Sequence, residues 1–187
     1  TIGESAFANC VFLNSIEMLD NVTNINSFAF QNCTKLNTVI IGGGLETIGE
    51  GAFQNCTGLI NLTIKEGLKY ISNRAFNGCT SLKEIVLPNS LLEIYGGRWT
   101  SDEYGAFQGC TGLKKVTIGD GLTTIGQRAF KGCINLEEVN LGSGLQTVGY
   151  EAFANAKSLE NIVLPRKTTT IGESAFANCV FLNSIEM

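Results

Sequence analysis

The chain has 187 residues, of which 44% are hydrophobic, and it contains 22 glycines but only 2 prolines. This composition is ordinary for a packed chain with many tight turns, and it excludes both collagen and Pro-rich disorder. The net charge of −4 is spread along the chain without a Lys/Arg cluster, which excludes a nucleic-acid partner, and the absence of His disfavours an enzyme.

The first residues, Thr1 to Cys10, lack the charged start and apolar stretch of a signal peptide, and the chain does not begin with Met. We therefore expect a mature segment or a fragment. No apolar run approaches the roughly 20 residues that span a bilayer, so we expect no membrane insertion.

An Ala-Phe pair recurs along the whole chain and defines eight units. The Phe positions are Phe7, Phe30, Phe53, Phe76, Phe107, Phe130, Phe153 and Phe176. Their spacing is 23 residues, except for one interval of 31 that contains an insertion of 8 residues. A Cys follows three residues later in seven units, at Cys10, Cys33, Cys56, Cys79, Cys110, Cys133 and Cys179. Ala156 replaces it in the remaining unit.

Each unit contains the pattern L-x-x-[IVL]-x-[ILM], as in Leu13, Ile16 and Met18. Its alternation with period two predicts a short strand whose apolar side faces inward. Equivalent strands of successive coils, stacked at about 4.8 Å, would form a parallel sheet.

A sharp turn follows each strand, as in Gly42-Gly43-Gly44, or begins with Pro88 or Pro165. A second short apolar segment comes next, and a compact Gly-x-x-Ala-Phe-x-[Asn/Gly]-Cys turn closes the coil. The position before Cys, or before Ala156, holds only Asn or Gly: Asn9, Asn32, Asn55, Gly78, Gly109, Gly132, Asn155 and Asn178. Both residue types tolerate a left-handed backbone, so this position is predicted to adopt it at the end of a short helical turn.

These motifs resemble the BspA-like, or Treponema pallidum type, leucine-rich repeat family across the whole chain. The resemblance implies a right-handed leucine-rich-repeat solenoid of the α/β type, made mostly of β-strands and turns. About eight stacked coils would carry one parallel β-sheet face, and residues 1–187 would form a single segment without terminal caps. It also implies an extracellular or cell-surface protein that acts in adhesion and in contact with a host or matrix.

The in-register Cys residues invite a disulfide or metal interpretation, but we expect buried free thiols. The count is odd, Ala replaces Cys once, and the C-x-x-C spacing of zinc sites is absent. The glycine turns recur once per coil, which favours a structural role over phosphate binding. We expect no cofactor, no metal and no catalytic residue.

The insertion, about residues 95–105, holds the only Trp of the chain. Its candidate contact residues are Tyr95, Arg98, Trp99, Asp102, Glu103 and Tyr104. Aromatic and Arg side chains dominate binding hot spots, so the segment is interpreted as a binding loop, with a structural excursion or a lateral contact as the alternative. Adjacent Asp102 and Glu103 are weak evidence for Ca²⁺ or acid chemistry.

Four N-x-T sequons are candidate glycosylation sites: Asn21, Asn32, Asn55 and Asn61. Asn32 and Asn55 lie at the position before Cys, where the predicted left-handed backbone already explains the presence of Asn. Asn21 and Asn61 are expected to be more exposed. The outward strand positions form a mixed polar strip that selects no particular ligand.

Residues 170–187 repeat residues 1–18 without a change, at an offset of 169. Adjacent units share far fewer residues, so a second level of repetition is needed: a superunit of seven coils, residues 1–169. Such a superunit would advance roughly 34 Å along the axis. It indicates either a recent duplication in a surface protein or a long fibril, continued covalently or head to tail with copies of itself.

Two functions follow from this sequence. The first is a non-enzymatic, extracellular structural or adhesive protein, with itself as the main partner. The second is a recognition module that binds a host or matrix protein or a polysaccharide through the sheet face or the Trp99 loop.

Overall fold

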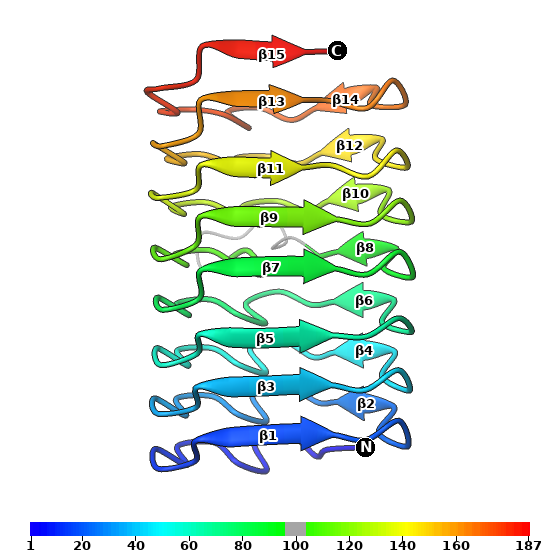
Figure 1. Cartoon of the computed structure of the whole chain (residues 1–187), viewed down its shortest axis with the longest axis vertical. Helices are drawn as coiled ribbons and strands as arrows, with labels where there is room; N and C mark the ends of the chain where they lie inside the picture. The colour runs from blue at the N-terminus through cyan, green and yellow to red at the C-terminus, as the bar shows by residue number, and fades with distance from the viewer. Residues whose placement is uncertain (96–103) are drawn as a thin grey trace.

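A computed structural model describes residues 1–95 and 104–187, and within them it shows a solenoid with two strands in nearly every coil (Figure 1). The front strands are β1 (Ser15–Met18), β3 (Thr38–Ile41), β5 (Asn61–Ile64), β7 (Glu84–Leu87), β9 (Lys115–Ile118), β11 (Glu138–Asn140), β13 (Asn161–Val163) and β15 (Ser184–Glu186). The back strands are β2 (Asn24–Ile25), β4 (Thr47–Ile48), β6 (Tyr70–Ile71), β8 (Glu93–Ile94), β10 (Thr124–Ile125), β12 (Thr147–Val148) and β14 (Thr170–Ile171).

The leucine-rich-repeat solenoid is confirmed, but the expectation of a single sheet face was wrong. The second apolar segment of each coil also pairs with its equivalents and forms a parallel sheet of seven strands, in the order β14-β12-β10-β8-β6-β4-β2. Its strands are only two residues long because the coil turns at both of their ends. In β2 to β12 the Ile or Val of each strand is buried in the core, whereas Ile171 of β14 is exposed. The backbone of each strand pairs with the neighbouring coils, as Ile48 does with Ile71.

The front strands fall into three groups, β1-β3-β5, β7-β9-β11 and β13-β15. In the described residues no ladder joins β5 to β7 or β11 to β13. Both interruptions coincide with a proline directly after the strand or one residue later, at Pro88 and Pro165. At the equivalent position of other coils, the N–H of Lys65 donates to Ile41 O (3.1 Å) and that of Gly119 donates to Leu87 O (3.0 Å). Proline has no N–H, so this bond to the preceding coil cannot form.

The closing turns contain no helix in the part of the chain that the structure describes, so the expected helical turn was wrong. In the first coil the N–H groups of Ser5, Phe7 and Asn9 donate to carbonyls of the next coil, at 3.0, 2.7 and 2.7 Å. A helix would direct these donors back along its own chain, whereas here they form a further ladder between coils. All eight Asn/Gly positions have positive φ, which confirms the prediction of a left-handed backbone.

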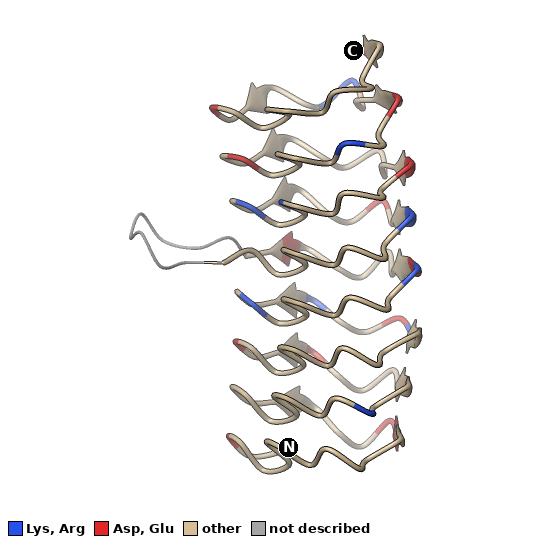
Figure 2. Ribbon diagram, turned by 90° about the vertical axis from the view of Figure 1, so that its left-hand side faces the viewer, with Lys and Arg blue, Asp and Glu red and all other residues tan. Residues whose placement is uncertain are grey.

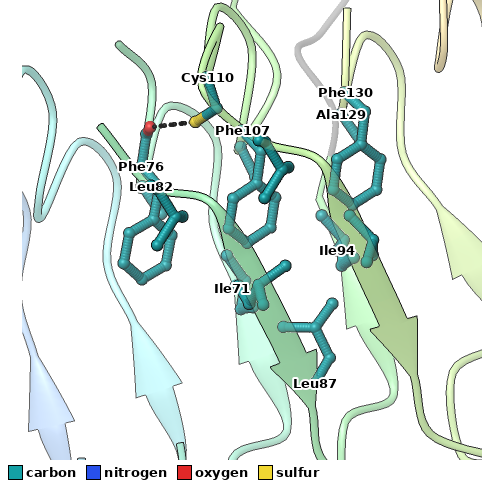
Figure 3. Packing of buried hydrophobic residues seen from close by; sticks show 14 of the residues in the cluster. Ile71, Phe76, Leu82, Leu87, Ile94, Phe107, Cys110, Ala129 and Phe130 are labelled. Atoms are coloured by element: carbon teal, nitrogen blue, oxygen red, sulfur yellow. Dashed lines mark hydrogen bonds between the residues drawn. The ribbon is translucent and has the colours of Figure 1, made fainter. Parts of the chain in front are cut away.

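The core is a series of similar layers in which Phe rings stack along the axis. Seven successive pairs of these rings have centroids 5.0 to 5.4 Å apart and planes within 9° of parallel. The stack continues across the insertion, where Phe76 and Phe107 are 5.1 Å apart. Figure 3 shows these rings above the Leu and Ile side chains of both sheets. The insertion therefore leaves the packing of the coils unchanged.

In residues 1–95 and 104–187 the structure contains no helix with the length and apolar character needed to cross a bilayer.

Candidate functional site

The described ends of the insertion pack on the preceding coil. The rings of Tyr95 and Tyr70 are 5.9 Å apart, and the guanidinium of Arg74 lies 5.2 Å from the centre of the Tyr104 ring. Tyr95 and Tyr104 remain partly exposed, at 40% and 43%. The other candidate contact residues, Arg98, Trp99, Asp102 and Glu103, lie outside the described residues.

The four sequon asparagines differ in their surroundings. Asn21 is exposed, and Asn61 is exposed on the front sheet, where its amide donates to Asn37 and Thr38. The amide of Asn32 donates to Asn9 Oδ1 (3.0 Å), and that of Asn55 donates to Asn32 Oδ1 (3.1 Å). The last two amides therefore link successive closing turns.

Six of the seven thiols are buried, and Cys10 in the first coil is exposed. Each buried Sγ donates to the carbonyl of the Phe in the preceding coil, as Cys110 does to Phe76 O at 3.2 Å (Figure 3). Burial raises the pKa of Cys110 to about 12 and raises the pKa values of Cys79 and Cys133 well above the usual range. These three thiols are therefore neutral hydrogen-bond donors at physiological pH.

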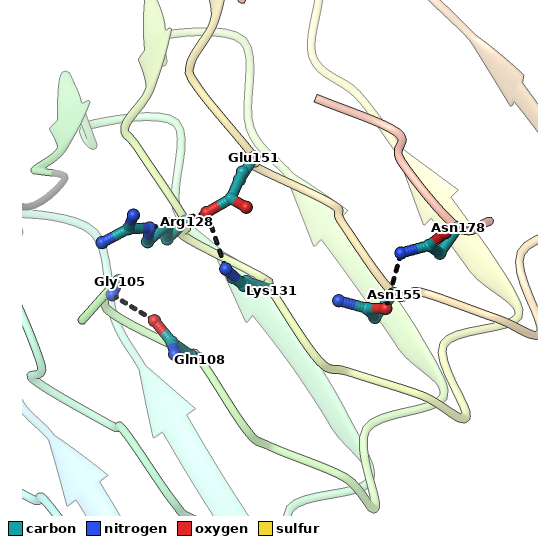
Figure 4. Close-up of polar contacts among 7 residues, drawn as sticks. All are labelled: Gly105, Gln108, Arg128, Lys131, Glu151, Asn155 and Asn178. Carbon is teal, nitrogen blue, oxygen red and sulfur yellow. Dashed lines mark hydrogen bonds and ion pairs between the residues drawn. The ribbon is translucent and has the colours of Figure 1, made fainter. Parts of the chain in front are cut away.

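Charged residues of both signs are distributed along the described part of the solenoid (Figure 2). Most ion pairs join adjacent coils, such as Lys115–Glu138 at 2.9 Å and Lys69–Glu46 at 2.8 Å. Glu151 contacts both Arg128 and Lys131, at 2.7 and 2.6 Å (Figure 4). Burial tends to raise the pKa of Glu151, but the hydrogen bonds from these two cations outweigh it and keep the pKa low.

The turn after each front strand, here called the post-strand turn, carries a second kind of bond between coils. Asp20 Oδ1 accepts from the N–H of Gly43 (2.8 Å), and Asp120 Oδ1 accepts from the N–H of Ser143 (2.8 Å). The latter bond is the main cause that lowers the pKa of Asp120, and the charge of Lys167 adds to it. Side-chain acceptors thus hold these exposed turns against one another.

A groove of about 610 Å³ lies over the interruption between β11 and β13. Its apolar wall consists of Val139, Leu141, Val163 and Pro165. Val163 is 59% exposed, so this wall is open to solvent. The groove therefore combines access from outside with an apolar surface, as small-ligand sites do.

The polar wall of the groove comes from post-strand turns and from β11. Its residues are Asp120, Asn140, Ser143, Arg166 and Lys167. The last two are exposed and adjacent, and in the described part of the chain no carboxylate forms an ion pair with either. Two cations without an ion pair to a described carboxylate thus line the same groove as the apolar wall, although the charge of Lys167 acts on Asp120.

The sequence interpretation missed this groove, because it treated the outward strand positions as a mixed polar strip that selects no particular ligand. Two residues carry the signal. Pro165 removes the N–H that would bond to the preceding coil, and Lys167 replaces the glycine found at Gly121 and Gly144. A Cβ at Gly144 would lie 2.1 Å from Asp120 O, so a side chain at this position holds two turns apart. At the other interruption, between β5 and β7, Pro88 and Ser90 stand at the positions of Pro165 and Lys167. There, however, Glu66 accepts from the N–H groups of both Asn89 and Ser90.

Comparisons with known proteins give one family. The family model described as BspA type leucine rich repeat region (6 copies) matches residues 1–99 and 100–187. No curated protein matches the chain.

Two solved structures share the fold with a TM-score of 0.80. A leucine-rich repeat protein from Bacteroides ovatus is 33% identical, and the match covers 93% of this chain and 45% of that one. The T. pallidum leucine rich repeat protein is 27% identical, and the match covers 92% of this chain and 79% of that one. The present chain thus spans less than half of the Bacteroides ovatus protein. A leucine rich cell surface protein from Faecalibacterium prausnitzii is more distant, with a TM-score of 0.41 and 20% identity over 98% of this chain and 82% of that one.

Proposed function

This chain belongs to the BspA-type leucine-rich repeat family, and from this starting point we propose that it is a non-enzymatic, extracellular segment of a structural and adhesive surface array. The array would be built from superunits of seven coils, each corresponding to residues 1–169. The observation that carries the proposal is that one coil sequence occurs twice, as residues 1–18 and 170–187, with different neighbours.

In its second occurrence this sequence stacks on the coil before it. The ring of Phe176 lies 5.4 Å from that of Phe153, and Cys179 Sγ donates to Phe153 O at 3.2 Å. The amide of Asn178 donates to Asn155 Oδ1 at 3.2 Å (Figure 4). This contact is the seam that would join the seventh coil of one superunit to the first coil of the next.

In its first occurrence the same sequence supports the coil after it. The rings of Phe7 and Phe30 are 5.0 Å apart, and Cys33 Sγ donates to Phe7 O at 3.1 Å. Strand β1 pairs in parallel with β3 over four residues. Both faces of the repeated coil are therefore compatible with a neighbour, and superunits can follow one another without a break in the ladders.

The adhesive part of the proposal is supported by exposed aromatic side chains at one corner of the repeated coil. Phe12 is 79% exposed and Phe181, at the same position in the repeat, is 63% exposed. The six intervening coils have small, polar or charged residues there, from Lys35 to Ser158. An array would thus present one such aromatic residue per superunit, a regular spacing suited to lateral or surface contacts.

The test is to express one, two and three copies of residues 1–169, each followed by residues 170–187. Small-angle scattering and electron microscopy should show rods whose length increases by roughly 34 Å per copy. Because neighbouring coils stabilise one another, the unfolding midpoint should also rise with copy number. Rods whose length does not increase regularly, or separate domains that unfold independently, would overturn the array.

The second candidate function is ligand recognition, and the groove between β11 and β13 favours it. A structural array has no need for an open, partly apolar groove with two cations that lack ion-pair partners among the described residues. The two functions are compatible, since a recognition site can recur once in each superunit.

A further inference from the structure

We propose that the groove between β11 and β13 is a binding site for an acidic saccharide, with its carboxylate or sulfate group held by Arg166 and Lys167. This site is distinct from the Trp99 loop, and it does not depend on whether superunits form an array.

The groove exists because three links between coils are missing at this step. No ladder joins β11 to β13 in the described residues, and Pro165 has no N–H to bond back to the preceding coil. In the preceding step Asp120 accepts from the N–H of Ser143, but in the part of the chain described Ser143 accepts no such bond from Arg166. The back sheet stays closed, because β12 pairs with β14. Thr168 Oγ1 also donates to Leu145 O at 3.1 Å, where the post-strand turns lead into the back strands. The opening is thus confined to the front edge.

The cations at this opening are not used to join coils. Lys114 and Lys115 each form an ion pair with a Glu of the next coil, at 2.9 Å. Arg166 and Lys167 have no such partner among the described carboxylates, and Asp120 on the same groove is already hydrogen-bonded to a backbone N–H. The groove therefore has an excess of positive charge in a chain whose net charge is −4. An Arg beside a Lys suits a carboxylate or a sulfate group.

The remaining walls suit a sugar ring. Val163 and Pro165 offer an apolar surface for the C–H face of a pyranose. The amide of Asn140 donates to Glu138 Oε1 at 2.6 Å, and Glu138 is held in turn by Lys115. This chain of contacts fixes the amide of Asn140 and leaves its carbonyl oxygen to accept from a sugar hydroxyl. The volume of about 610 Å³ falls in the range of small-ligand sites and accommodates a short oligosaccharide.

The experiment measures binding of defined probes to the whole 187-residue chain by calorimetry at low and physiological salt. The probes are a digalacturonate, a sulfated disaccharide, the neutral disaccharide digalactose and the acidic peptide Asp-Asp-Asp. Binding of the digalacturonate, the sulfated disaccharide or both, at least about tenfold tighter than digalactose, is expected, and it identifies the acid group that the site prefers. Tighter binding of the peptide, or equal binding of digalactose, would overturn the proposal, as would no binding of either acidic sugar.

A matched pair of variants tests the location. Arg166→Ala with Lys167→Ala should weaken binding of the preferred acidic sugar about tenfold or more. Lys83→Ala with Lys157→Ala removes the same charge from two exposed lysines outside the groove and should change binding less than about twofold. Equal losses in both variants would show a general charge effect and contradict the site. Circular dichroism would verify that both variants keep the fold.

A third variant closes the groove while keeping both cations. Ser143→Glu places a Glu where Glu66 holds the equivalent turn three coils earlier. It should raise the unfolding midpoint and abolish binding of the acidic sugar. Undiminished binding to this variant would contradict the proposed site.

Discussion

Cys110 Sγ donates a hydrogen bond of 3.2 Å to the carbonyl oxygen of Phe76 in the preceding coil. That oxygen also accepts from the N–H of Cys79, at 3.2 Å, so donors from two successive coils share it. The thiol therefore joins adjacent coils in addition to filling space. Ala156 has no thiol, so its coil lacks this bond. The carbonyl oxygen of Phe130 therefore accepts from the backbone N–H of Cys133 but from no thiol.

Replacing Cys110 by Ala should lower the free energy of unfolding by about 1–2 kcal/mol, because it removes both a weak hydrogen bond and buried volume. The reverse change, Ala156→Cys, should raise it by about 0.5 kcal/mol by adding the missing donor. Urea denaturation measures both. If Ala156→Cys destabilises the protein by more than Cys110→Ala does, the thiol is not a general link between coils.

Thiol labelling should distinguish the exposed thiol from the buried ones. Cys10 is exposed, whereas the other six cysteines are buried and donate to Phe carbonyls. A thiol reagent at pH 8 should therefore react rapidly with one equivalent, and with the remaining six only after denaturation. A Cys10→Ser control should show no rapid phase. Rapid reaction of several thiols would indicate that the coils open readily.

Stability should fall at alkaline pH because the buried thiols resist ionisation. The pKa of Cys110 rises from 9.0 to about 12 on folding. Above pH 9 the unfolded chain releases this proton while the folded chain retains it, so stability present below pH 9 is lost as the pH rises toward 12. Cys110 alone should account for about 1.4 kcal/mol at pH 10. Urea denaturation at pH 8 and pH 10 measures the loss, and Cys110→Ala should show a smaller one.

Two glycines should differ sharply in their tolerance of Ala. A Cβ at Gly121 would lie 2.0 Å from the carbonyl oxygen of Asn89, a backbone atom of the preceding coil. Gly121→Ala should therefore cost about 3 kcal/mol or more, since two coils must separate. A Cβ at Gly109 meets nothing within 4 Å, so Gly109→Ala should cost only about 1 kcal/mol, the strain of a φ of 73°. Similar losses on thermal denaturation would contradict the close approach of the post-strand turns.

The period of 23 residues was sufficient to predict the solenoid, the inward strand positions and the left-handed Asn/Gly position. Each of these follows from a residue type that recurs in every coil. The back sheet was not foreseen, because a single Ile or Val in a two-residue segment, such as Thr47–Ile48, does not distinguish a short strand from a turn. A second position with positive φ, which includes Phe28, Arg74 and Glu151, was also missed. Its residues have no conformational preference in common, so the ladders between coils, and not the local sequence, impose that backbone.

The groove depends on residues that differ between coils, so the repeat pattern alone could not predict it. Pro165 and Lys167 differ from the residues that most coils have at the same repeat positions, whereas the repeat pattern is defined by the residues that the coils share. Their effect also depends on Ser143, which is too short to bridge the turns as Glu66 does. The contact residues Arg98, Trp99, Asp102 and Glu103 and the four sequons remain predictions.

The two interruptions of the front sheet also have a mechanical meaning. Nearly all hydrogen bonds and ion pairs between coils join nearest neighbours. A pulling force along the axis therefore acts equally on each step, and the step with the fewest bonds withstands the least force. At β11 and β13 the described residues have neither the front ladder nor a carboxylate that holds the next turn as Glu66 does, so a stretched chain should rupture there before it ruptures at β5 and β7. Single-molecule stretching of several superunits joined in tandem should show this as one early, low-force event per superunit, which would let an array lengthen in steps instead of breaking.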